Sequence, residues 1–185
     1  MTETAVSPVF IVTGASRGIG YAIVQELLRR GARVLGAARN PDTASAILVK
    51  ASSGNCHYLQ ADITVETDRL RIIEKAKDLF GRIDGLINNA GHAVRTPASK
   101  TSIDDFRALL EINLLAAFRL AQAACEELRA TRGTLVNISS VNKNLSRSRR
   151  RQSGYSGHCR DLISLNERPV WYLRAIGKAS TGAYD

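Results

Sequence analysis

Short apolar runs alternate with amphipathic stretches along the first 141 residues of the chain. Each run is bounded by turn residues, and such runs are typical of buried parallel strands. The strands that this pattern predicts are Val9–Thr13, Arg33–Ala37, His57–Gln60, Gly85–Asn88 and Thr134–Ser139. Because helical patterns separate them, the sequence predicts an α/β fold with a doubly wound, Rossmann-like parallel sheet of about five strands and flanking helices.

Three stretches between these strands have the apolar spacing of helices that pack on a sheet. The first predicted helix ends at Gly31 and has its apolar face at Ile19, Ile23, Val24, Leu27 and Leu28. The second ends before Gly81 and has on one face Leu70, Ile73, Ala76 and Phe80. The longest helix runs from about Ile103 to Ala130, and Ser102 is its expected N-cap because Asp105 follows three residues later.

The pattern changes after Val141. Residues 142–154 have no apolar period, and only 161–165 and 169–176 are apolar enough to pack. Residues 142–185 contain nine Lys or Arg and three acidic residues, so this tail accounts for +6 of the chain's net charge of +9. We therefore expect a folded domain over residues 6–141 and a basic, weakly ordered tail over residues 142–185.

The composition is that of a soluble globular protein, with 44% hydrophobic and 23% charged residues. We expect no membrane span and no secretory signal, because the chain has neither a long apolar run nor a basic, then apolar, N-terminus. Cys56, Cys125 and Cys159 are odd in number and lack ligand spacing, which predicts reduced thiols, a cytoplasmic location and no metal site.

The segment Thr13–Gly20, with the sequence TGASRGIG, links the first strand to the first helix. Gly14 permits a tight bend, whereas Gly18 and Gly20 let the backbone approach a phosphate and let the helix pack on the sheet. The start of the helix also offers free N–H groups and a partial positive charge. This arrangement predicts a site for the pyrophosphate of a nicotinamide dinucleotide. The alternative is a plain strand-to-helix turn with incidental glycines.

The spacing of these glycines departs from the commoner G-x-G-x-x-G and resembles that of the short-chain dehydrogenase/reductase family. Three further segments, each after a predicted strand, carry the same resemblance: Asp62–Ile63, Asn88–Gly91 and Asn137–Ser140. The resemblance covers residues 8–141. It implies an oxidoreductase that transfers hydride between a nicotinamide cofactor and a carbonyl or hydroxyl group of a small-molecule substrate.

The end of the second predicted strand favours NADP (NADPH) over NAD. The sequence GAARN at residues 36–40 lacks the acid that would bind the ribose 2′-hydroxyl of NAD. Arg39 can make a forked contact with a 2′-phosphate, and Arg17 adds a second positive charge. The alternative is that both arginines are solvated surface residues. The expected cofactor contacts are Gly14, Ser16, Arg17, Gly18, Ile19, Gly20, Arg39, Asn40, Asp62, Ile63, Asn89, Ala90 and Gly91.

The resemblance also implies catalytic residues. Asn113 lies on an apolar helical face, where its polar side chain needs hydrogen-bond partners. The resemblance implies that it holds a proton-relaying water. The alternative is a structural hydrogen bond to a strand end. Ser140 is expected to hydrogen-bond the substrate carbonyl. The family's proton donor is a tyrosine with a lysine four residues later. Tyr155 stands at nearly that distance, but Cys159 stands where the lysine would be.

This departure leads to a second interpretation of the chain. We expect that the sequence is truncated or frame-shifted after about residue 141, so that the fold is incomplete on its C-terminal side. The alternative function is then a catalytically inactive remnant that binds cofactor weakly or acts only as an interaction protein. The resemblance implies a homo-oligomer, although half of the usual interface is missing. Nucleic-acid binding through 146–151 is the weaker alternative to a solvated basic tail.

Overall fold

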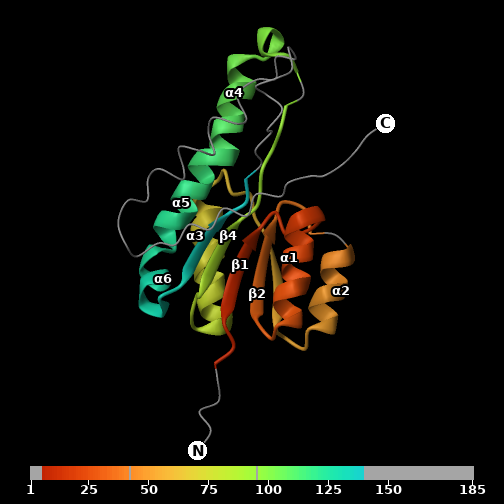
Figure 1. Cartoon of the computed structure of the whole chain (residues 1–185), viewed down its shortest axis with the longest axis vertical. Coiled ribbons are helices and arrows are strands. Elements are labelled where there is room, and N and C mark those ends of the chain that lie inside the picture. The colour runs from red at the N-terminus through yellow and green to blue at the C-terminus, as the bar shows by residue number, and fades with distance from the viewer. Residues whose placement is uncertain (1–5, 42, 95, 140–185) are drawn as a thin grey trace, which may run out of the picture.

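Five parallel strands form one sheet in the computed structural model, which describes residues 6–41, 43–94 and 96–139 (Figure 1). The sheet has the order β3-β2-β1-β4-β5. The strands are β1 (Val9–Thr13), β2 (Arg33–Ala38), β3 (Cys56–Gln60), β4 (Gly85–Asn88) and β5 (Thr134–Asn137). The predicted Rossmann-like sheet is therefore confirmed. The predicted tail, residues 142–185, lies outside the described residues.

Helices cover both faces of the sheet (Figure 1). α1 and α2 pack on one face around Val12, Val24 and Val34, and α3, α5 and α6 pack on the other around Ile11, Leu35 and other apolar side chains. The helical elements are α1 (Gly18–Arg29), α2 (Thr43–Ala51), α3 (Glu66–Phe80), η1 (Ala98–Lys100), α4 (Ile103–Leu110), η2 (Glu111–Leu115), α5 (Ala116–Ala123) and α6 (Cys125–Thr131). The sequence pattern made no prediction for α2.

The longest predicted helix is divided into four elements. Its start is as expected, because the Ser102 hydroxyl accepts a hydrogen bond from the backbone N–H of Asp105 at 3.0 Å. η2 is a π-helical turn, and a bend of 56° separates Ile103–Ala123 from α6. Among the described residues no single helix is long and apolar enough to cross a membrane. The two segments on either side of the bend reach that length and apolar content only when they are taken together.

Two predicted core positions are wrong. Leu70 was expected on the buried face of α3, but it is 49% exposed, and the neighbouring Arg69 is 4% exposed in its place. Arg69 can be buried because its guanidinium donates a 2.7 Å hydrogen bond to the Ile63 carbonyl. Ile19 was expected on the buried face of α1, but it is 50% exposed because it lies in the first turn, beyond the sheet. The ladder of β5 also ends at Asn137, two residues earlier than predicted.

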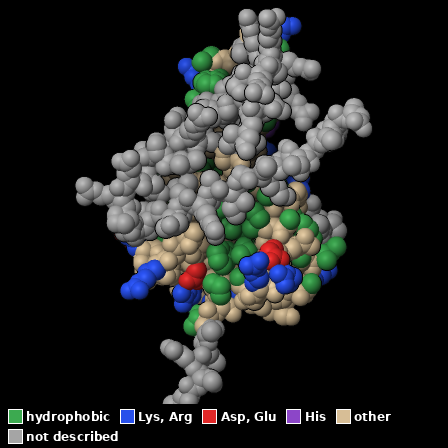
Figure 2. Space-filling model, in the orientation of Figure 1, with side chains coloured by type: hydrophobic (Ala, Val, Ile, Leu, Met, Phe, Trp, Pro, Cys, Tyr) green, Lys and Arg blue, Asp and Glu red, His purple; other side chains and the backbone are tan. Residues whose placement is uncertain are grey.

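Several charged side chains on the surface form ion pairs. Glu26 lies against Arg29 and Arg30, and Arg82 against Asp84. Figure 2 shows acidic and basic side chains beside one another on the face in view. Such exposed pairs contribute little to stability.

Candidate cofactor-binding site

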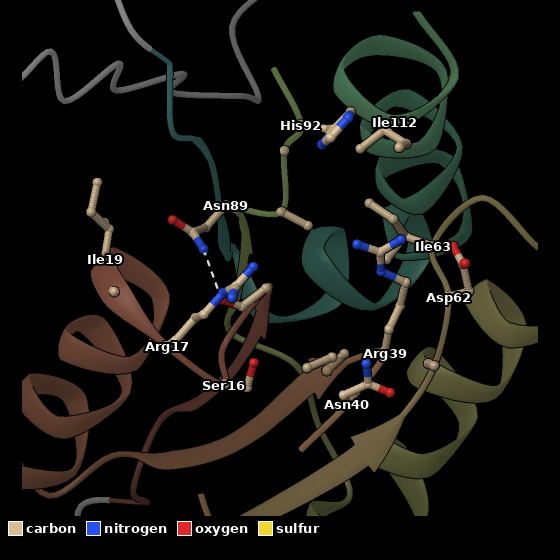
Figure 3. Close-up of a pocket in the computed structure, with 17 residues that line it drawn as sticks. Ser16, Arg17, Ile19, Arg39, Asn40, Asp62, Ile63, Asn89, His92 and Ile112 are labelled. Carbon is tan, nitrogen blue, oxygen red and sulfur yellow. Dashed lines mark hydrogen bonds between the residues drawn. The ribbon is translucent and has the colours of Figure 1, made fainter. Parts of the chain in front are cut away.

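A cavity of about 600 Å³ opens at the carboxyl ends of the central strands (Figure 3). The connection from β1 runs to β2 on one side, whereas β4 lies on the other, so the cavity is at the point where the strand order reverses. Ligands of open α/β sheets bind at this point. Its wall consists of the turn after β1, the end of β2, the loop after β3, the segment after β4 and one residue of η2.

The structure brings nearly all the predicted cofactor contacts together around this cavity. The predicted residues that line it are Gly14, Ser16, Arg17, Gly18, Ile19, Arg39, Asn40, Asp62, Ile63, Asn89, Ala90 and Gly91. Gly20 is buried behind the wall instead. Further lining residues were not predicted, namely Ala37, Ala38, Ala61 and Ile112; His92, which the sequence offered as a possible cleft residue and favoured as a plain loop residue, also lines the cavity. Apart from His92, which directly follows the Asn88–Gly91 motif, these residues carry no local sequence signal.

The turn after β1 needs glycine at two positions for different reasons. Gly14 has φ +63°, and a Cβ there would lie 2.8 Å from the Ala90 Cα. A Cβ on Gly20 would lie 2.3 Å from the Gly14 carbonyl oxygen. Both distances are too short for any larger residue. The turn, the start of α1 and the segment after β4 can therefore approach one another only in this form.

The N-terminus of α1 faces the cavity without a side-chain cap. Its N-cap residue, Arg17, has an extended backbone and makes no capping hydrogen bond, and the first turn contains no acidic residue. The first N–H groups of a helix lack intrahelical acceptors and carry a partial positive charge. An anionic group placed here would gain both the hydrogen bonds and the charge.

Thr13 and Asn89 hold the two central strands together at the base of the cavity. The Thr13 hydroxyl oxygen accepts hydrogen bonds from the backbone N–H groups of Asn89 at 3.0 Å and Ala90 at 3.1 Å. In return, the Asn89 side-chain amide donates to the carbonyl oxygens of Thr13 at 2.9 Å and Gly14 at 3.1 Å. This reciprocal set fixes the segment after β4 against the glycine turn.

Two arginines give the cavity its charge. Figure 3 shows Arg17 and Arg39 on opposite sides of the space, with Ser16 and Asn40 at one end and His92 and Ile112 at the other. Among the described residues neither arginine makes a salt bridge. Both guanidinium groups are therefore available to a ligand.

Asp62 is the acidic residue in the described wall of the cavity. Burial by itself raises the pKa of Asp62, but hydrogen bonds from the backbone N–H and the hydroxyl of Thr64, together with the charge of Arg39, outweigh burial and lower the pKa. The two Thr64 hydrogen bonds measure 2.9 Å and 2.8 Å. Asp62 is therefore a carboxylate at neutral pH, with one oxygen held by Thr64.

Asn113 is the one predicted catalytic residue that the described structure places. Its side-chain oxygen accepts from the His92 backbone N–H at 2.9 Å, and its amide nitrogen donates to the His92 carbonyl at 2.8 Å. It thereby ties η2 to the loop after β4, rather than to a strand end. Ser140 and Tyr155 lie outside the described residues, as does Cys159.

Comparisons with known proteins agree with this geometry. The family model described as short chain dehydrogenase matches residues 8–157. L-fucose dehydrogenase of Mus musculus is 37% identical over 72% of this chain and 48% of its own length. A tropinone reductase homolog of Arabidopsis thaliana is 38% identical over 71% of this chain and 51% of its own.

A solved structure of a short-chain dehydrogenase from Streptomyces avermitilis matches with a TM-score of 0.69 and 31% identity, over 75% of this chain and 51% of that one. The fold, the cavity and these matches define one class of protein. The chain belongs to the short-chain dehydrogenase family. It spans about half the length of the curated relatives that it matches.

Proposed function

We propose that this chain binds NADP(H) in the cavity and acts as an oxidoreductase on a small molecule with a carbonyl or hydroxyl group. The observation that carries the proposal is the pairing of an uncapped helix N-terminus with two unpaired arginines around one cavity. Family membership supports a nicotinamide cofactor. Arg39 at the end of β2, where an acid would bind NAD, favours the phosphorylated form.

The residues present fit such a dinucleotide. A cavity of about 600 Å³ lies within the range of cofactor sites, roughly 300–1,000 Å³. The start of α1 would hold the pyrophosphate, Arg17 and Arg39 the 2′-phosphate, and Asp62 with Ile63 the adenine. The segment Asn89–Gly91 would line the nicotinamide side.

When bound, the dinucleotide supplies or accepts the hydride. This chain's own residues then position the substrate and the proton. In the proposal Ser140 donates a hydrogen bond to the substrate carbonyl oxygen, and Tyr155 is the candidate proton donor. Asn113 holds the His92 loop at the cavity through two hydrogen bonds. Cys159 stands where the family has lysine, so we expect proton donation to be impaired; complete loss of general acid catalysis would cost about 10²–10⁴-fold in rate.

Fluorescence titration with NADPH and NADH tests the cofactor. We expect Arg39→Gln to weaken NADPH binding about tenfold, as for the loss of one exposed charge-assisted hydrogen bond, and to leave NADH binding unchanged. Arg129→Gln, an exposed arginine on α6 that does not line the cavity, is the matched control. Equal affinity of the wild-type chain for the two cofactors would overturn the choice of NADP.

Oxidation of NADPH in the presence of ketones and quinones tests the activity. Turnover that Ser140→Ala abolishes supports the oxidoreductase, and cofactor binding without turnover supports the inactive remnant.

The free thiols of Cys56 and Cys125 support the proposed cytoplasmic location. Self-association remains a proposal too; Leu115 and Phe118, 43% and 42% exposed, support it.

A further inference from the structure

Tyr58 of β3 reaches across the neighbouring strand to the glycine turn. Its hydroxyl donates a 3.0 Å hydrogen bond to the carbonyl oxygen of Ala15. In the sheet register Tyr58 stands opposite Gly36 of β2, and Gly36 stands opposite Val12 of β1. The side chain therefore passes over β2 to reach the chain that follows β1.

Gly36 makes this passage possible. A Cβ at Gly36 would lie 2.6 Å from the Cε1 atom of the Tyr58 ring. No Cβ fits at that distance, so an alanine here would displace the ring. A glycine in the middle of a strand weakens it, but Gly36 leaves room for the Tyr58 ring to pass and reach the Ala15 carbonyl.

Ala15 is held from two strands. It is 0% exposed, its N–H donates to the Ala37 carbonyl of β2 at 3.3 Å, and its carbonyl accepts from Tyr58 of β3. The Ala15 carbonyl and the Ser16 N–H belong to one planar trans peptide, in which they point in opposite directions. The hydroxyl of Tyr58 therefore sets the direction of the Ser16 N–H, away from Tyr58, and Ser16 lines the cavity.

We infer that Tyr58 is a positioning residue for the cofactor-binding turn, and that Gly36 is glycine so that Tyr58 can reach it. The inference rests on the proposed function, since the ligand that the turn would hold is the pyrophosphate of the dinucleotide. Tyr58 itself does not line the cavity. It acts on the ligand through the peptide between Ala15 and Ser16.

Titration of full-length variants with two ligands tests this role. NADPH carries a pyrophosphate, and adenosine 2′-monophosphate carries the adenine and the 2′-phosphate without it. For Tyr58→Phe we expect the Kd of NADPH to rise about three- to tenfold, the effect of one neutral hydrogen bond, while binding of the monophosphate holds. The unfolding temperature should fall, because the buried Ala15 carbonyl loses its donor, so both titrations are made at a temperature at which the variant is folded. Tyr21→Phe is the control, because its hydroxyl makes no hydrogen bond among the described residues.

A double-mutant cycle tests the glycine. Gly36→Ala should weaken NADPH binding at least as much as Tyr58→Phe, and it should have no further effect in a Tyr58→Ala background, where no ring is left to displace. Equal loss for both ligands in Tyr58→Phe, or additive losses in the cycle, would overturn the positioning role. A wild-type chain that binds neither ligand would overturn the proposed function and this inference with it.

Discussion

Replacement of Thr13 by alanine removes the acceptor that joins β1 to the segment after β4. Thr13 is 1% exposed, and its hydroxyl oxygen accepts from the backbone N–H groups of Asn89 and Ala90 at 3.0 Å and 3.1 Å. A buried donor without an acceptor costs about 1–3 kcal/mol. Since both residues are half-buried, we expect the free energy of unfolding to fall by about 2–3 kcal/mol for the two together.

Two further substitutions separate the hydrogen bonds from side-chain volume. Thr13→Val keeps the shape without the hydroxyl, so it should lose the stability of the two hydrogen bonds. Thr13→Ala should be less stable than Thr13→Val, because it also loses a buried methyl group. Thr13→Ser keeps the hydroxyl and loses one buried methyl group, at a cost of about 1 kcal/mol. Urea unfolding followed by circular dichroism measures all three. If Thr13→Val is as stable as Thr13→Ser, the hydrogen bonds do not carry this stability and the reasoning is refuted.

The same variants connect stability to the cavity. Asn89 and Ala90 line it, so their release should also change the ligand contacts. We expect NADPH affinity to fall in Thr13→Ala and Thr13→Val and to hold in Thr13→Ser. Fluorescence titration of the three proteins, at a temperature where all are folded, measures this order.

Three further predictions follow from buried or charged groups. Arg69→Met should lower the free energy of unfolding by about 1–3 kcal/mol, because the Ile63 carbonyl loses its donor; urea unfolding measures it, and unchanged stability would contradict it. Burial raises the pKa of Cys56 to about 11, so with the other cysteines replaced by alanine, iodoacetamide at about pH 8 should modify it only after unfolding, as mass spectrometry would detect. The pKa of Asp62 is lowered from 3.8, so the Asp62 carboxylate stabilises the fold above that pH. This stabilisation is lost as the pH falls through the lowered pKa. Urea unfolding should therefore show that Asp62→Asn is less stable than wild type at pH 7, and that the difference disappears in acid.

The sheet could be predicted from sequence because each strand is a short apolar run between turn residues. Most of the cavity wall could be predicted as well, since the glycine turn and the segment Asn88–Gly91 carry their own local signals. Both depend on residues that are close together in the chain. The order of the strands then brings these segments to one end of the sheet.

The failures concern contacts between distant residues. Arg69 is polar, so the apolar pattern predicted Leu70 as the buried residue. Arg69 is buried because it contacts the Ile63 carbonyl and Glu111 of η2, and the spacing of apolar residues within one helix cannot predict such contacts. The contact of Tyr58 with Ala15 depends on the register of three strands. Nothing local marks the π-helical turn that interrupts the longest helix.

The side-chain amide of Asn113 has the same donor and acceptor as a peptide bond, and both are used on His92. A neighbouring strand satisfies the backbone N–H and carbonyl groups of β4 through its own peptide groups. The Asn113 side chain satisfies the N–H and carbonyl of His92 in the same way, beyond the end of the sheet. The consequence is mechanical. We expect the helix that carries Asn113 and the loop that carries His92 to move together, so that a ligand that shifts the loop also shifts the helix. Aspartate, which has the shape but lacks the donor, would keep the hydrogen bond from the His92 N–H and lose the one to the His92 carbonyl oxygen.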